Sequence, residues 1–295
     1  MSVTITPLTP GFVGEVAGID LTQALTADHI AAIEAGMDQY AVLVFHDQRV
    51  TDEQQIAFSR NFGPLEPAVN ANVTALADRR LGLELADISN LDKNNQIFGR
   101  DSRQRMFNLG NQLWHSDASF RAVPAKYSLL SARAVTSWGG NTEFADMRAA
   151  WDALDDATQQ EIETLICEHS LMYSRGVLGF DSYTDDELKA FRPVRQSLVR
   201  RHPVTGRKSL FLSAHIGTII GWPVPEARAF VRDLTEHATQ RKFVHAHQWR
   251  VGDLVIWDNR TTMHRARRYP DTGEARDMRR TTIMGDGPTT EQIAA

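Results

Sequence analysis

The hydrophobic pattern of this chain predicts many short strands. Residues 41–45 form an uninterrupted apolar run of strand length, which is typical of a buried strand. Two pairs of strand-like segments flank turn sequences, so we expect hairpins between 197–202 and 208–213 and between 243–249 and 254–257. Further strands are predicted within 3–19 and at 83–88, 127–135, 142–145 and 279–284.

Helices are predicted at fewer places, mostly behind residues that can cap them. Thr26 precedes an amphipathic segment that runs to about Gln39, and residues 51–54 have the capping-box pattern. Other helical segments are expected at 147–154, 157–166, after Thr184 and at 225–238. Strands and helices do not alternate regularly, which argues against a doubly wound parallel sheet. The pattern favours a mainly β protein with flanking helices, a double-stranded β-helix or jelly roll, as a single domain over residues 1–295.

Residues 66–112 depart from this pattern. They look irregular from 66 to 82, and 90–112 are rich in charged and amide side chains. Long ordered loops in compact domains are often active-site lids, so we expect a lid within 66–112, directly before His115. The alternative is a mobile surface excursion.

Composition excludes several classes of function. The chain has 295 residues and a net charge of −5, which argues against general nucleic-acid binding. No 18-residue apolar segment or signal peptide is evident, so neither a membrane span nor membrane association is expected. Cys167 is the single cysteine, which rules out an intrachain disulfide and a cysteine-based zinc site and suits a cytoplasmic location.

The candidate chemistry lies in residues 113–120, where His115 and Asp117 stand two positions apart. In extended chain they would project to one face. His264 follows the strand 254–257 and a polar turn, so we expect it just past a strand end, at a barrel rim. Two imidazoles and a carboxylate on one side of a metal leave positions open for substrates, as in non-haem Fe(II) oxygenases.

Three other interpretations of these residues stay open at this point. A histidine near a carboxylate is often only a structural pair. The same ligands could hold zinc in a hydrolase, although the sequence contains no His-Glu-x-x-His motif. A jelly roll that binds a metal or ligand without catalysis would also fit. Among the remaining histidines, His215 could line a pocket.

Several motifs together resemble the taurine dioxygenase family of Fe(II)- and 2-oxoglutarate-dependent enzymes. They are residues 114–120, 139–142, 257–260 with His264, 276–282, and the stretches 54–66 and 86–90. Within the family the closer similarity is to the 2,4-dichlorophenoxyacetate dioxygenase branch, carried by 111–117, 144–150 and 237–241.

The resemblance implies roles for individual residues. Its pattern assigns His115, Asp117 and His264 to Fe(II), and Thr142 and Arg276 to the distal carboxylate of 2-oxoglutarate. Arg280 would lie near the metal-bound end of 2-oxoglutarate or near an anionic substrate, since a guanidinium offers a bidentate fork to a carboxylate. The other candidates for substrate contact are Ser116, Ala118, Lys93 and His215.

The resemblance also implies the reaction. With O2 and 2-oxoglutarate, the enzyme would hydroxylate a small anionic aromatic substrate, an aryloxyacetate such as 2,4-dichlorophenoxyacetate. The products would be a phenol, glyoxylate, succinate and CO2. An alkylsulfonate or another aryloxyalkanoate is the alternative substrate. Family members suggest a homo-oligomer.

Two departures from the family pattern bear on these expectations. Asn141 stands where the family often has aspartate, although Thr142 is retained. Residues 67–73, after Glu66, contain neither the lysine nor the histidine that relatives carry in this region. The identity of the substrate is therefore more open than the chemistry.

Overall fold

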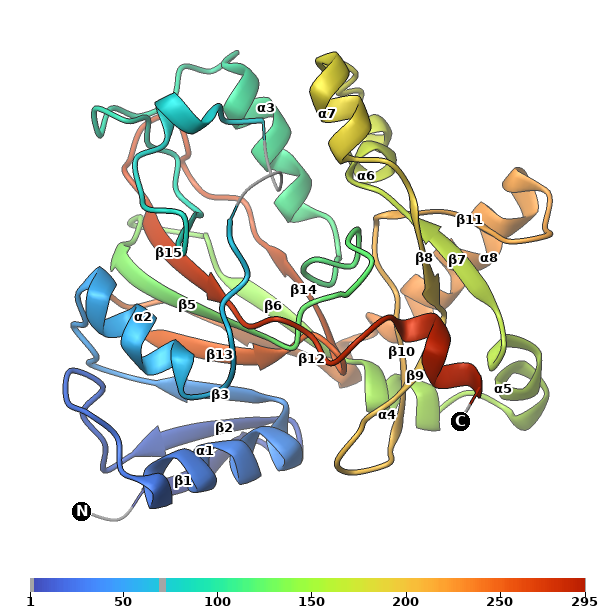
Figure 1. Cartoon of the computed structure of the whole chain (residues 1–295), viewed down its shortest axis with the longest axis horizontal. Helices are drawn as coiled ribbons and strands as arrows, with labels where there is room; N and C mark the ends of the chain where they lie inside the picture. Colours follow the sequence, from blue (N-terminus) through green and yellow to red (C-terminus); the bar gives the residue numbers. More distant parts are fainter. Residues whose placement is uncertain (1–2, 69–72, 295) are drawn as a thin grey trace.

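Alternate side chains of the central strands face two different hydrophobic cores, as the strand geometry requires. In the computed structural model, which describes residues 3–68 and 73–294, Val42 and Val44 point to one core, and Leu43 and Phe45 point to the other. These strands belong to a seven-stranded sheet (Figure 1). Its spatial order is β1 (Thr4–Thr9), β2 (Val13–Ala17), β3 (Val42–Phe45), β13 (Leu254–Asp258), β5 (Tyr127–Ala134), β15 (Asp277–Thr282) and β4 (Ala86–Asp87).

The first core joins this sheet to a smaller one. The small sheet has the order β12 (Val244–His247), β6 (Thr142–Asp146) and β14 (Thr262–Ala266), with antiparallel pairing throughout. Phe144 of β6 packs in one cluster with Leu130, Val255 and Trp257 of the large sheet. Two sheets that enclose a core in this way confirm the predicted mainly β, jelly-roll architecture.

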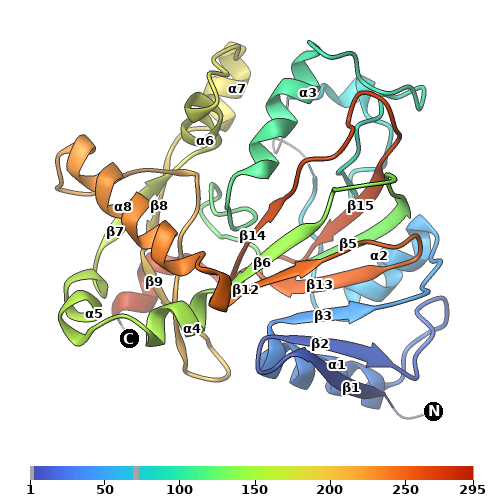
Figure 2. The ribbon, with the colours of Figure 1, turned by 180° about the vertical axis from the view of Figure 1, so that it is seen from behind.

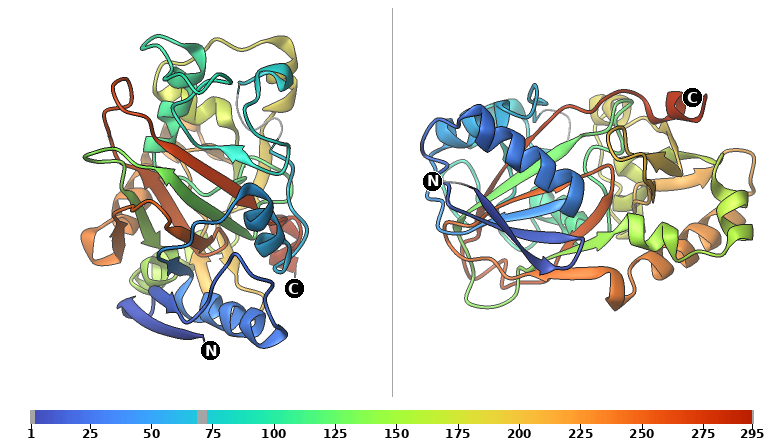
Figure 3. Two further views of the ribbon diagram at one scale, coloured as in Figure 1. Left: turned by 90° about the vertical axis from the view of Figure 1, so that its left-hand side faces the viewer. Right: turned by 90° about the horizontal axis from the view of Figure 1, so that it is seen from below.

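The second core lies on the opposite face of the large sheet. The helices α1 (Ala27–Tyr40) and α2 (Asp52–Arg60) cover it (Figure 3), and Ile33, Met37 and Phe58 are its main helical contributors. Both helices begin as predicted. Thr26 accepts a hydrogen bond from the backbone N–H of His29, and Thr51 forms a capping box with Gln54.

A long insertion between β6 and β12 forms the lobe on the right of Figure 1 and on the left of Figure 2. Its core gathers Trp151, Ile162, Leu198, Leu212 and Leu234. Its elements are α4 (Met147–Asp152), α5 (Asp156–Ile162), β7 (Ile166–His169), α6 (Leu171–Val177), α7 (Asp185–Ala190), β8 (Val194–Ser197), β9 (Val199–Arg201), β10 (Lys208–Leu210), β11 (Ile216–Ile219), α8 (Val224–Ala238) and η3 (Arg241–Phe243). The short helix η4 (Thr289–Ala294) follows the last strand.

Three predictions of secondary structure were wrong. Strands β12 and β13 do not form a hairpin, because β12 pairs with β6 and β13 pairs with β3 and β5 in the other sheet. The helix predicted over 157–166 ends at Ile162, and Ile166 opens a strand. The predicted strand at 83–88 is reduced to the two residues of β4.

The described parts of 66–112, which are residues 66–68 and 73–112, contain more regular structure than a loop. They contain η1 (Leu76–Asp78), α3 (Arg103–Asn108) and η2 (Leu109–Gln112), and Phe107 is buried against Leu171 and Phe191 of the insertion. Residues 69–72 lie outside the described residues, so the lid prediction remains a prediction. Within the part of the chain that the structure covers, no helix combines the length and apolar character that a membrane span needs.

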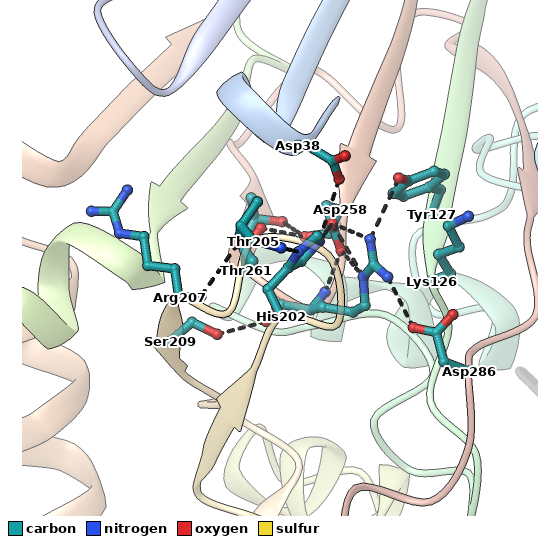
Figure 4. Close-up of polar contacts among 12 residues, drawn as sticks. Asp38, Lys126, Tyr127, His202, Thr205, Arg207, Ser209, Asp258, Thr261 and Asp286 are labelled. Carbon is teal, nitrogen blue, oxygen red and sulfur yellow. Dashed lines mark hydrogen bonds and ion pairs between the residues drawn. The ribbon is translucent and has the colours of Figure 1, made fainter. Parts of the chain in front are cut away.

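A buried ionic network fixes the turn between β13 and β14 (Figure 4). Asp258 accepts hydrogen bonds from the side chain and backbone N–H of Arg260, at 2.8–2.9 Å, and its Oδ2 lies 3.2 Å from Nε2 of His202. Arg260 also donates to Asp286 at 2.9 Å. Despite burial, these partners hold the pKa of Asp258 well below its usual range. The turn is thus fixed by charges that water does not screen.

Replacing Asp258 with Asn is expected to lower the free energy of unfolding by about 3–5 kcal/mol, because Arg260 would lose its main anionic partner in a buried setting. Replacing Asp286 with Asn is the matched control. Its side chain is 37% exposed, so we expect a loss below about 1 kcal/mol. Urea denaturation followed by circular dichroism measures both losses. Equal losses of unfolding free energy would show that the buried pair of Asp258 and Arg260 does not stabilise the fold more than the exposed contact of Asp286.

Candidate active site

Two backbone hydrogen bonds bring the predicted histidines together. The N–H of His115 donates to the carbonyl of His264 at 2.9 Å, and the N–H of His264 donates to the carbonyl of His115 at 2.8 Å. The ring centroids are 4.3 Å apart. Asp117 follows two positions later, and one potential ligand atom from each of the three buried residues lies within 4.8 Å of the others.

The strand position of His264 differs from the prediction. It lies inside β14, opposite Phe144 of β6, and not beyond a strand end. Its ring lies 4.8 Å from that of Trp257 and 6.1 Å from that of Phe144, which limits its rotation. The histidine is therefore held within the barrel between the two sheets.

Neighbouring groups orient the other two side chains. Nδ1 of His115 lies 2.7 Å from the carbonyl oxygen of Leu113, which favours a tautomer with a free lone pair on Nε2. Ser128 donates its hydroxyl hydrogen to Oδ2 of Asp117 at 2.8 Å, and Arg280 donates to Oδ1. The side chain of Asn259 donates to Ser128 and accepts from the backbone N–H of Asp117. These contacts form an outer shell of the kind that supports metal ligands.

The electrostatics of the cluster suit a divalent metal. Burial lowers the pKa of His264 to about 3 and also lowers that of His115. Burial raises the pKa of Asp117, but Arg280 and the two histidines outweigh it and bring the value down to about 2. At neutral pH the cluster therefore presents two neutral imidazoles and one carboxylate, the protonation states that metal binding requires.

A first cavity beside the cluster, which we call the Arg276 cavity, is lined by His115, Thr142, Trp257, His264, Arg276 and Arg280 among others. Arg276 is buried and forms no ion pair within the described residues. Its guanidinium donates to the carbonyls of Ile88 and Gly140 at 3.3–3.4 Å and lies 5.2 Å from the ring of Tyr269. Thr142 accepts from the indole N–H of Trp249 at 2.9 Å, so its own hydroxyl hydrogen is available.

A second cavity, which we call the Arg175 cavity, also borders the cluster. His115, Asp117 and Arg280 line it, as do Arg175 and His215. His215 thus occupies the predicted pocket position, with Nδ1 2.9 Å from the hydroxyl of Ser174 and its ring 5.9 Å from that of His115. The apolar part of the lining includes Phe107, Phe120 and Leu171. His115, Arg280, Ile88 and Asn111 line both cavities, so the cluster stands where the two meet.

Three of the predicted substrate contacts lie elsewhere. Lys93 pairs with Asp78 at 2.7 Å, is half exposed, and lines a separate surface depression. Ser116 donates its hydroxyl hydrogen to the carbonyls of Leu212 and Thr262, at 3.1 Å, and lines neither cavity. Ala118 has a φ of 55° and also lines neither. The hydrogen bonds of Ser116 direct its side chain toward Leu212 and Thr262 and away from the cavities that His115 and Asp117 line.

Sequence reasoning missed Arg175, Asn111 and Phe107 as parts of the site. A signal was present for Arg175, because it is the only charged residue within the short helix α6. Phe107 was hidden in a stretch that read as an irregular loop. Residues 69–72 lie outside the described residues. They belong to the segment 67–73, which contains neither lysine nor histidine.

Comparison with known proteins agrees with this geometry. The family model of the taurine catabolism dioxygenase TauD, TfdA family, matches residues 4–282. An alpha-ketoglutarate-dependent 2,4-dichlorophenoxyacetate dioxygenase from Cupriavidus pinatubonensis is 48% identical, over 97% of this chain and 99% of that protein. An (S)-phenoxypropionate/alpha-ketoglutarate-dioxygenase from Sphingobium herbicidovorans is 37% identical, over 99% of this chain and 98% of the relative.

Solved structures extend the comparison to three dimensions. A crystal structure of AAD-2 in complex with Mn(II) and N-oxalylglycine superposes with a TM-score of 0.96 at 59% identity, covering 98% of this chain and 100% of that one. The matches span nearly the whole length of both partners, so the similarity is not confined to a motif. The chain belongs to the TauD/TfdA family and is an Fe(II)- and 2-oxoglutarate-dependent dioxygenase.

Proposed function

We propose that this enzyme hydroxylates an aryloxyacetate at the carbon between the ether oxygen and the carboxylate. The observation that carries the proposal is the position of the His115, Asp117 and His264 cluster at the junction of two arginine-containing cavities. One cavity suits 2-oxoglutarate, and the other combines cations with the aromatic side chains of Phe107 and Phe120. The 48%-identical relative is named for 2,4-dichlorophenoxyacetate, which supports this substrate class.

His115, Asp117 and His264 would hold Fe(II). Their imidazole and carboxylate donors are the set that non-haem Fe(II) oxygenases use, and the cluster fits one ion. When bound, Fe(II) supplies the oxidising chemistry, in which O2 and 2-oxoglutarate give CO2, succinate and one oxygen atom for the substrate. Ser128 and Asn259 would keep the carboxylate of Asp117 in place.

Arg276 and Thr142 would bind the distal carboxylate of 2-oxoglutarate. Arg276 is a buried cation without an acidic partner in the described chain, and Thr142 has a free hydroxyl hydrogen. Together they offer charge-assisted and neutral hydrogen bonds to one carboxylate. Arg280 contacts Asp117 and lines both cavities, and it would keep the carboxylate of Asp117 ionised.

The reaction accounts for its products by simple chemistry. Hydroxylation replaces one C–H bond next to the ether oxygen with C–OH, which gives a hemiacetal. The hemiacetal loses the aryloxide and transfers its hydroxyl proton to it, so the products are a phenol and glyoxylate. The second atom of O2 leaves in succinate.

A substrate panel tests the proposal. Purified enzyme with Fe(II), 2-oxoglutarate and O2 is offered phenoxyacetate, 2,4-dichlorophenoxyacetate, both enantiomers of 2-phenoxypropionate, a cinnamate and an alkylsulfonate. We expect an aryloxyacetate to give succinate and a phenol in equal amounts. Succinate release with the alkylsulfonate alone would show that the substrate is a different kind of anion. If no acid in the panel causes succinate release, the proposed substrate class is contradicted.

Replacing Asp117 with Ala is expected to abolish coupled turnover, because the metal would lose its only anionic protein ligand. Replacing Ser128 with Ala removes only the hydrogen bond that orients this ligand, so we expect about a 10- to 100-fold loss of metal affinity or activity. Succinate assays and Mn(II) titrations of both variants measure this gradation. Full activity of D117A would show that the ligand assignment is wrong.

Replacing Arg276 with Met should raise KM for 2-oxoglutarate about 10- to 100-fold, since charge-assisted hydrogen bonds contribute roughly 1.5–3 kcal/mol. KM for the aryloxyacetate should change little, because Arg276 does not line the Arg175 cavity. Steady-state kinetics with each substrate varied in turn separates the two effects. An unchanged KM for 2-oxoglutarate would refute the role of Arg276.

Between about pH 8 and pH 6 the affinity for the metal should fall by clearly less than tenfold. Burial lowers the pKa of His264 to about 3 and shifts the pKa of His115 in the same direction, so protons compete with the metal less than they would at two ordinary imidazoles. A site with two imidazoles of the ordinary pKa of about 6.5 would bind the metal roughly tenfold more weakly at pH 6 than at pH 8. Equilibrium dialysis of Mn(II) measures the difference, and a tenfold loss would show that the burial of these rings does not control their protonation.

A further inference from the structure

Arg175 is a buried cation in the wall of the Arg175 cavity. It lies on α6 and is 4% exposed, and the same cavity is lined by His115, Asp117, Arg280 and His215. Arg175 donates a hydrogen bond to the hydroxyl of Ser174, which lies 2.9 Å from Nδ1 of His215, and the ring of His215 lies 5.9 Å from that of His115. The guanidinium therefore stands within electrostatic range of the candidate metal cluster.

No carboxylate within the described residues forms an ion pair with Arg175. Its hydrogen bonds go to neutral acceptors, the hydroxyl of Ser174 at 3.0 Å and the side-chain oxygen of Asn111 at 3.3 Å. Its Nε–H has no hydrogen-bond partner among the residues that the structure describes. Among the described residues that line the cavity, Asp87 is the one acidic residue besides Asp117, and it is paired with Arg80 at 2.8 Å. A buried charge without a counter-ion destabilises the folded protein. An anionic ligand that binds beside Arg175 would remove this cost.

The surrounding chain holds the guanidinium in place. Its Cζ lies 4.5 Å from the centre of the Phe107 ring, a cation–π contact. Gly110 allows this position, because a Cβ added there would lie 2.5 Å from Cζ and Nε of Arg175. The side chain of Arg175 is therefore already ordered before any ligand binds. Ligand binding then does not have to supply the conformational entropy of ordering it.

The second cation of the cavity differs from Arg175 in its partner. Arg280 contacts the carboxylate of Asp117, so its charge is already balanced. His215 is neutral, because burial and the charge of Arg175 lower its pKa well below the ordinary value. The segment 67–73 offers no lysine or histidine. Of the charged groups that line this cavity, Arg175 is the cation left without an anion.

We propose that Arg175 is the receptor for the substrate's carboxylate. This inference rests on the proposed function and adds the residue that selects a small anionic acid. A carboxylate held between Arg175 and Asn111 would place the adjoining carbon in the same cavity as His115 and Asp117. The apolar lining of Phe120 and Leu171 would take the aryl ring. Arg175 thus acts as a specificity determinant, and the cation missing after Glu66 is supplied from the insertion.

The test compares a charged substrate with a neutral one of the same shape. Binding of phenoxyacetate and phenoxyacetamide is measured anaerobically, by their effect on the visible absorption of the Fe(II)–2-oxoglutarate complex. In Arg175→Met we expect the dissociation constant of phenoxyacetate to rise at least about tenfold, as the loss of a charge-assisted contact predicts. The values for phenoxyacetamide and for 2-oxoglutarate should stay within about twofold.

Two further variants control for folding and for burial. Arg200→Met removes another buried arginine that lacks an ion pair in the described chain and lies outside both cavities, so it should bind phenoxyacetate as the wild type does. Arg175→Lys keeps the charge but loses the planar fork, so it should weaken phenoxyacetate binding less than Arg175→Met and leave phenoxyacetamide unchanged. If Arg175→Met does not fold, Arg175→Lys alone decides between these outcomes.

The outcomes separate the two proposals. If the wild type converts aryloxyacetates but the Arg175 variants bind phenoxyacetate as tightly as it does, the role of Arg175 is wrong and the proposed function stands. Equal weakening of phenoxyacetate and phenoxyacetamide would likewise show that Arg175 only supports the cavity wall. If the wild type neither binds nor converts aryloxyacetates, both proposals are overturned.

Discussion

The pair of backbone hydrogen bonds between His115 and His264 is the contact on which the site depends. It joins the segment before β5 to β14, so two histidines separated by about half of the chain become neighbours. A backbone bridge fixes both side chains at once, because neither Cα can move without breaking a bond that is buried from water. The Asp258 network strengthens this junction from the turn that leads into β14. The insertion and the two sheets contribute the rest of the lining of the two cavities that meet there.

The balance of buried charges also determines which ligands the site can bind. Three arginines, Arg175, Arg276 and Arg280, line the two cavities, and the cluster contributes one carboxylate, Asp117, which Arg280 already contacts. The protein therefore carries an excess of buried positive charge before its substrates arrive. 2-Oxoglutarate and an aryloxyacetate both bring carboxylates, so binding would relieve a cost that the folded protein otherwise carries. Neutral molecules of the same shape would not gain this energy.

Local chemistry explains which parts of the fold were predictable. The caps at Thr26 and Thr51 and the apolar run of β3 depend on neighbouring residues, so the sequence pattern was sufficient. The pairing of β12 with β6 depends on which sheet each strand joins, and a turn sequence between β12 and β13 carries no such information. The same limit applies to the site. Residue chemistry indicated His115, Asp117 and His264, and the family resemblance added Thr142, Arg276 and Arg280. The structure gathers all six around the two cavities. The single charged residue of α6 was a signal for Arg175, but a sequence pattern does not show that the packing of α6 against Phe107 brings it to this cavity.

The most direct test of the account is the position of the metal. Crystals grown without oxygen in the presence of Mn(II) and N-oxalylglycine would be measured near the manganese absorption edge. We expect one strong anomalous peak between the side chains of His115, Asp117 and His264, with the N-oxalylglycine carboxylate reaching Arg276 and Thr142. A fully occupied metal bound elsewhere, with this cluster empty, would contradict the account.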